Sequence, residues 1–133
     1  MPTLNEARDK ILDLAKQFGW GISKDHLATK IFYAMIELGE AGDAWKHRGD
    51  REWLQRELNL STEQDLTRHV AEELIDAIFY CLNGLYCLDP QIDIDCEFNK
   101  KWEKNREILI SVPIPTLWFM PEREINPGSM KVT

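Results

Sequence analysis

The chain has 133 residues, which is the size of a single domain and enough to bury one hydrophobic core. Apolar residues make up 44% of it and charged residues 29%, a balance that is typical of globular proteins and excludes a disordered chain. The net charge of −7 argues against a nucleic-acid partner, which needs a basic face, but it permits a phosphate substrate held through a divalent metal ion.

The first half of the chain predicts two helices. The first spans residues 4–18, between a capping box of the Thr-x-x-Glu type and a glycine. The second is capped by Ser23, continues through Trp45 and stops near Gly49. After it, residues 50–60 are expected to form a charged connection with no more than a short turn of helix.

Two further helices and a tail follow. Ser61 and Gln64 repeat the capping-box pattern and open a third helix, which persists to Leu88 before an Asp-Pro pair ends it. A fourth helix starts at residues 93–95. Four prolines exclude a regular helix over residues 111–133, so we expect an extended tail whose short apolar run packs on the bundle or on a partner subunit.

The sequence therefore predicts an all-α fold: one domain over residues 1–110, built as an antiparallel bundle of about four helices. No apolar stretch reaches the ~18 to 20 residues that a membrane span needs, and the N-terminus does not resemble a signal peptide. We expect a cytoplasmic protein without membrane contact. The cysteines match no zinc-binding spacing and are expected to be small buried thiols.

Carboxylates interrupt the apolar sequence of the third predicted helix. Residues 70–88 are apolar nearly all the way round, which predicts a helix that is buried on most of its faces. Glu73 and Asp76 nevertheless lie within about 60° of each other on this helix, since successive residues are ~100° apart. The second predicted helix repeats the pattern with Glu37 and Glu40, again three residues apart in nearly apolar sequence.

Two carboxylate pairs inside apolar helices predict a metal site. An ionised carboxylate is costly to bury unless it is paired or bound to metal, and neither helix carries enough arginine on the same face. Ligands that are all oxygen favour Mg²⁺, with Mn²⁺ as a substitute, over zinc or copper. One pair alone is usually a solvated helix face. A di-iron site is a poor alternative, because it needs Glu-x-x-His and no histidine here has a glutamate three residues before it.

The two acidic motifs resemble the ExxE…ExxD signature of the MazG-like, all-α nucleoside triphosphate pyrophosphohydrolases. Glu37 and Glu40 match the first motif, and Glu73 and Asp76 match the second. Relatives in this superfamily are the dimeric dUTPases, the dCTP pyrophosphatases and phosphoribosyl-ATP pyrophosphohydrolase. The resemblance covers roughly residues 25–110.

A basic segment, residues 101–106, is similar to the third motif of that family. Many relatives have an arginine three residues after the asparagine of this motif, where this chain has Ile108. Arg106 is the residue that could replace that arginine. The phosphate-binding end of the expected site therefore departs from the family pattern, whereas both acidic motifs match it.

The resemblance implies a homodimer, or a dimer of dimers, that uses Mg²⁺ to hydrolyse a nucleoside triphosphate to the monophosphate and pyrophosphate. Such an activity removes unwanted nucleotides from the cellular pool. One alternative is a phosphoribosyl-ATP pyrophosphohydrolase with the same metal chemistry. Another is a non-catalytic, acidic helical dimerisation module. The sequence does not indicate which base or sugar is preferred.

The resemblance also implies roles for individual residues. The expected metal ligands are Glu37, Glu40, Glu73 and Asp76. The residue expected to act as general base, taking the proton of the attacking water, is Glu40. The residues expected to bind phosphate are Lys30, Lys101, Lys104, Asn105 and Arg106. For Lys30, two turns before Glu37, an ordinary lysine on the helix surface is an equally good interpretation.

Overall fold

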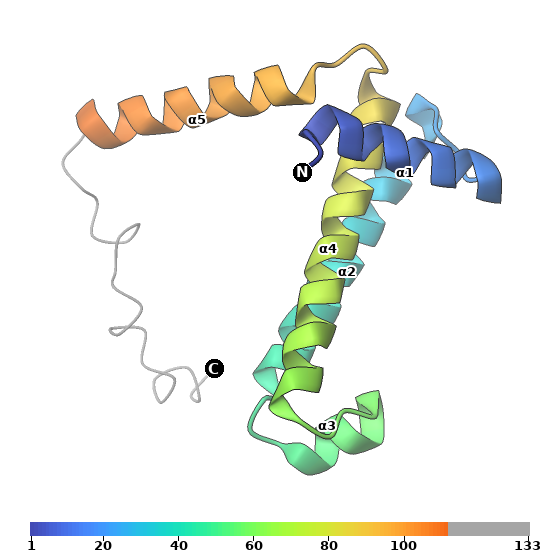
Figure 1. Ribbon diagram of the computed structural model, residues 1–133, viewed down its shortest axis with the longest axis vertical. Helices are drawn as coiled ribbons and strands as arrows, with labels where there is room; N and C mark the ends of the chain where they lie inside the picture. Colours follow the sequence, from blue (N-terminus) through green and yellow to red (C-terminus); the bar gives the residue numbers. More distant parts are fainter. Residues whose placement is uncertain (112–133) are drawn as a thin grey trace. The chain divides into compact units, whose positions relative to one another are not determined.

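The computed structural model describes residues 1–111, with the side chains of residues 1–108 (Figure 1). All regular structure in this part of the chain is helical, which confirms the all-α class. The elements are α1 (Leu4–Phe18), η1 (Lys24–His26), α2 (Leu27–Lys46), α3 (Arg51–Leu58), α4 (Glu63–Leu88) and α5 (Ile94–Ser111). The chain divides into two compact units, and the boundary lies between Asp95 and Cys96. The predicted tail lies outside the described residues beyond Ser111.

Helix α1 begins and ends where the sequence predicts. The hydroxyl of Thr3 accepts a hydrogen bond from the Glu6 backbone N–H at 3.1 Å, and the Glu6 carboxylate accepts one from the Thr3 N–H at 2.9 Å. Gly19 ends the helix in the left-handed conformation, with φ of 69°, which a residue without Cβ adopts at little cost. The apolar side of α1 packs on the end of α4 through Ile11 and Leu82.

The start of α1 is also tied to the start of α5. The Asp95 carboxylate accepts hydrogen bonds from the backbone N–H groups of Leu4 and Asn5 at 3.0 and 3.2 Å. In return, the Asn5 side-chain oxygen accepts one from the Ile94 N–H at 2.8 Å. These bonds satisfy backbone donors that a helix N-terminus leaves without intrahelical partners. The connection after α4 is thereby fixed against α1.

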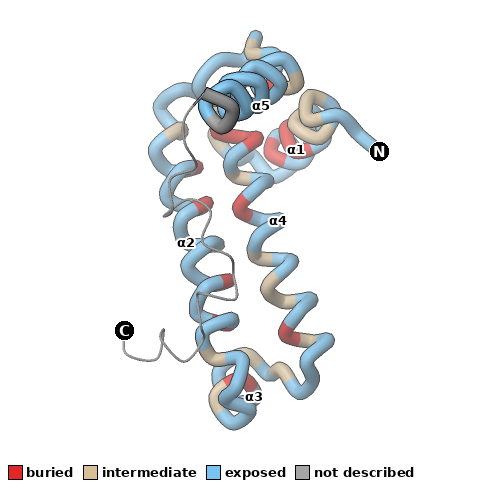
Figure 2. Tube along the Cα trace, turned by 90° about the vertical axis from the view of Figure 1, so that its left-hand side faces the viewer, coloured by how far each residue is buried: buried red, intermediate tan, exposed pale blue. Residues whose placement is uncertain are grey.

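Helices α2 and α4 lie side by side in opposite directions (Figures 1 and 2). Small residues allow their close approach: Ala34, Ala41 and Ala44 of α2 are buried, and so is Ala77 of α4. At Gly84 an added Cβ would meet Leu27 and Lys30 atoms at 3.5 and 3.6 Å, which is ordinary contact distance. The helix pair is therefore the frame that can hold residues of the two acidic motifs opposite one another.

The predicted start of the second helix is wrong by one turn. The first turn after Ser23 is the 3-10 helix η1, and α2 begins only at Leu27. Ser23 caps no backbone N–H; its hydroxyl lies 2.9 Å from Nδ1 of His26 instead. The local side-chain partner thus competes with the helix N-terminus for this hydroxyl.

The charged connection over residues 50–60 contains more helix than the one short turn predicted there, since α3 spans 8 residues. Asp50 caps helix α3 by accepting a hydrogen bond from the Trp53 N–H at 3.0 Å. Leu54 of this helix is buried against Ala44 of α2 and Leu66 of α4. This contact joins the end of α2 to the start of α4. A short helix therefore takes part in the core where the sequence suggested only a charged linker.

The next helix, α4, begins one residue later than the capping box that the sequence suggested. Thr62 and Asp65 form the box, with a bond of 3.0 Å from the Asp65 N–H to the Thr62 hydroxyl. The Ser61 hydroxyl donates instead to the Gln55 side chain at 2.7 Å. The predicted end at Leu88 is confirmed.

The expectation that α4 is buried on most faces is wrong for the single chain. Leu74, Ile75, Ile78 and Phe79 are all more than 40% exposed. The reason is that α4 packs mainly against α2 and, at one end, α1, so much of its apolar surface has no neighbour within residues 1–95 (Figure 2). Of the cysteines only Cys87 is buried, so the expectation of three buried thiols is wrong as well. None of the described helices is long and apolar enough to cross a membrane.

Candidate functional site

Three carboxylates from the two acidic motifs meet between α2 and α4. Glu37 of α2 and Glu73 and Asp76 of α4 each place an oxygen within 4.8 Å of the others. The antiparallel packing of α2 and α4 brings these residues together. The rings of Tyr33 and Tyr80, one turn from Glu37 and Asp76 on the two helices, meet as well, with centroids 5.3 Å apart. Among the described residues this is the one group of three potential metal ligands so close together.

The protonation of Glu37 reflects this crowding. A hydrogen bond with Glu73 raises its pKa most, from 4.5 to about 7, and partial burial and the charges of Glu73 and Asp76 add to the rise. A hydrogen bond with Glu40 acts in the opposite direction. Without a cation, the group reduces its own repulsion by keeping a proton on Glu37. A divalent cation could replace that proton and offset two of the three carboxylate charges.

The remaining predicted ligand, Glu40, stands beside the group. It is exposed and does not belong to the three residues whose oxygens converge, but it is near enough to Glu37 to lower the pKa of that carboxyl. The structure thus brings three of the four predicted ligands together, and the fourth adjoins them. This position leaves Glu40 accessible to solvent and near the predicted metal, as the role of general base requires.

The buried side of α2 also contains Lys30, which is only 6% exposed. Lys30 lies two turns before Glu37 in α2 and packs against Gly84 of α4. No described carboxylate lies within ion-pair distance of its ammonium group. The interpretation of Lys30 as an ordinary surface lysine is therefore wrong. Its predicted phosphate contact stays a prediction.

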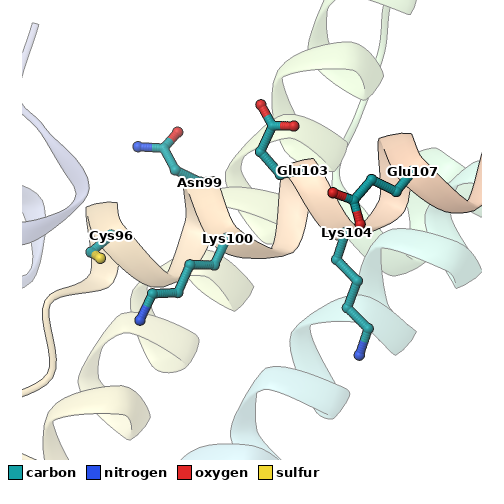
Figure 3. A pocket seen from close by; sticks show the side chains of 6 residues that line it. All are labelled: Cys96, Asn99, Lys100, Glu103, Lys104 and Glu107. Atoms are coloured by element: carbon teal, nitrogen blue, oxygen red, sulfur yellow. The ribbon is translucent and has the colours of Figure 1, made fainter.

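The other predicted phosphate-binding residues lie on α5, in the second unit. They are Lys101, Lys104, Asn105 and Arg106, and all are exposed. Nε of Arg106 is 3.4 Å from a Glu103 carboxylate oxygen. The side chains of Lys100 and Lys104 extend to the same side of the helix (Figure 3). Acidic side chains alternate with the basic ones here, so α5 is not a uniformly positive surface.

His69 is a neighbour of the carboxylates that the acidic motifs did not indicate. His69 Nε2 lies 3.6 Å from Glu73 Oε1, and the two side chains are 23% and 15% exposed. The signal was the spacing of four residues, which places both on one face of α4. Tyr33 packs against Tyr80, whose pKa is raised by burial first and then by the charges of Glu37 and Asp76.

The donor set fits a hard divalent cation. Carboxylate oxygens are the ligands that Mg²⁺ and Mn²⁺ prefer in proteins, and Mg²⁺ is usually held by a few carboxylates with waters in the remaining positions. A soft metal is not favoured, because no cysteine and no histidine belongs to the converging group of described residues. The arrangement can therefore fix a cation at which a phosphate oxygen and a water could meet.

The shared proton predicts how the metal-free protein responds to pH. Because folding raises the pKa of Glu37, its contribution to stability is complete below pH 4.5 and is lost as the pH rises through about 7. Melting curves in a chelating buffer should show this loss, on the order of 1 kcal/mol after solvent screening, in the parent and not in Glu37→Gln. Equal pH dependence in both proteins would show that Glu37 does not carry the proton.

Comparison of the chain with protein-family models, with curated proteins and with solved structures finds no match. The geometry of the three carboxylates is therefore the observation that bears on function.

Proposed function

We propose that the protein is a Mg²⁺-dependent pyrophosphohydrolase that cleaves a nucleoside triphosphate to the monophosphate and pyrophosphate. The observation that carries this proposal is the convergence of Glu37, Glu73 and Asp76, from two helices, within 4.8 Å. The raised pKa of Glu37 supports it, because a site with excess negative charge favours a divalent cation. The resemblance of the two motifs to ExxE…ExxD supports the choice of reaction.

Each residue has a role in the proposed reaction. Glu37, Glu73 and Asp76 hold the Mg²⁺, which when bound neutralises phosphate charge and makes a water more acidic. Glu40, exposed and next to Glu37, accepts the proton of the attacking water. The basic side chains of α5 are proposed to stabilise negative charge on the phosphates, since positioning and electrostatics dominate phosphoryl chemistry.

The proposed enzyme is a homodimer. The stripe Ile31, Met35 and Leu38 of α2 borders a groove of about 510 Å³, and Cys81 and Leu88 of α4 border its other side. All three residues of the α2 stripe are at least half exposed. A monomer rarely leaves so much contiguous apolar surface in water, and a second copy of the helix pair would cover it. The same surface also fits a non-catalytic dimerisation module, the rival function.

A pyrophosphate-release screen tests the proposed function. Purified protein is incubated with Mg²⁺ and each ribonucleoside and deoxyribonucleoside triphosphate, several damaged nucleotides and phosphoribosyl-ATP. We expect release of pyrophosphate, together with the monophosphate, from at least one triphosphate, and none after Mg²⁺ is removed with a chelator. Release from phosphoribosyl-ATP alone would favour the alternative enzyme. Thermal stabilisation by Mg²⁺ without release from any substrate would favour the non-catalytic module.

A further inference from the structure

His69 stands next to one of the three converging carboxylates without belonging to their group. Its Nε2 atom is 3.6 Å from Oε1 of Glu73, and both side chains are largely buried, at 23% and 15% exposure. Glu73 in turn shares a hydrogen bond with Glu37 on the other helix. The Glu73 carboxylate therefore has a carboxyl neighbour across the helix pair and an imidazole neighbour on its own helix.

A carboxylate that binds a metal works best when its orientation is fixed. A half-buried glutamate has three side-chain torsions, and like charges nearby favour rotamers that turn it away from the site. A neighbouring N–H group restrains it, and removal of such an outer partner typically costs about 10- to 100-fold in metal affinity. The protonated Glu37 carboxyl can donate to Glu73 only while no cation replaces its proton, whereas His69 can offer a donor to Oε1 with or without the cation.

We propose that His69 is a positioning residue, which holds the Glu73 carboxylate in place for the divalent cation. The inference rests on the proposed metal site and adds a residue that the acidic motifs do not contain. His69 need not bind the cation, because its own nitrogen lies outside the oxygens that converge. Its Nε2–H would contact one oxygen of Glu73 and leave the other oxygen for the metal.

The test measures binding of Mn²⁺ alone, by the electron paramagnetic resonance signal of the free ion, at one fixed pH. His69→Ala removes the donor, and His69→Gln keeps an N–H group at similar reach. His47→Ala is the matched control: His47 forms the same kind of i,i+4 pair with Asp43, at 3.5 Å, away from the three carboxylates. Circular dichroism melting of each variant checks that it is folded.

We expect His69→Ala to weaken Mn²⁺ binding about 10- to 100-fold, with His69→Gln and His47→Ala within a few-fold of the parent. A purely structural role predicts instead that melting temperature falls while Mn²⁺ affinity of the folded protein is unchanged, which would overturn the proposal. Equal weakening in His69→Ala and His69→Gln would overturn it too. If the parent itself binds no Mn²⁺, the metal site and the proposed function fail together; if the parent binds and His69→Ala binds equally well, only the positioning role fails.

Discussion

Glu73→Gln and Asp76→Asn are each expected to abolish nearly all pyrophosphohydrolase activity, by at least about 100-fold, together with the stabilisation that Mg²⁺ gives. Both changes keep the size of the side chain and its capacity for hydrogen bonds, but they remove the charge that a hard cation requires. Melting curves with and without Mg²⁺, alongside pyrophosphate release, measure both effects.

Metal-free buffer separates a metal site from a structural acidic network. The charges of Glu73 and Asp76 raise the pKa of Glu37, so either neutral variant should be as stable as the parent, or more stable, without metal. A structural network predicts the reverse: destabilised variants that still respond to Mg²⁺. Glu72→Gln is the control, because Glu72 precedes Glu73 in α4, is exposed and lies outside the converging group.

Light scattering at micromolar concentration should return at least the mass of a dimer, and Ile31→Lys should shift it to the monomer. Ile31 borders the apolar groove and is 52% exposed in the single chain, so a lysine there can reach water in the monomer but not within an apolar interface. Loss of one buried aliphatic side chain, ~1.5 to 3 kcal/mol, plus the cost of desolvating the ammonium should weaken association at least about 100-fold.

Gln17→Lys provides the control for that charge change. Gln17 is an exposed residue of α1 that does not line the groove, and its replacement should leave the mass unchanged. A monomeric parent would contradict the proposed dimer outright. A dimeric parent with a dimeric Ile31→Lys variant would place the interface on another surface.

Local sequence signals predicted the helices that local contacts determine. Thr3, Glu6 and Gly19 lie next to the ends of α1, and their hydrogen bonds are made within that helix and its caps. The start of α4 was mispredicted because Ser61 and Thr62 are both good caps. The choice depends on Gln55 of α3, which takes the Ser61 hydroxyl through a contact that no local pattern contains.

The sequence likewise predicted part of the candidate site but not all of it. Periodicity places Glu73 and Asp76 on one side of α4, and the structure agrees. Spacing alone could not distinguish Glu37, which turns toward α4, from the exposed Glu40 three residues later. That difference depends on how α2 is rotated against its neighbour. Periodicity also shows that a face is apolar, but not whether a helix of the same chain covers it.

The alignment of the two acidic motifs depends on a connection remote from them. Leu54 of α3 packs on Ala44 and Leu66 and so holds the end of α2 against the start of α4. A helix advances ~1.5 Å and turns ~100° per residue, so a residue transferred from this connection into either helix would rotate one carboxylate set away from the other. Insertions and deletions within residues 47–62 should therefore be restricted, whereas residues 20–22, before the helix pair begins, can change in length without altering which acids face each other.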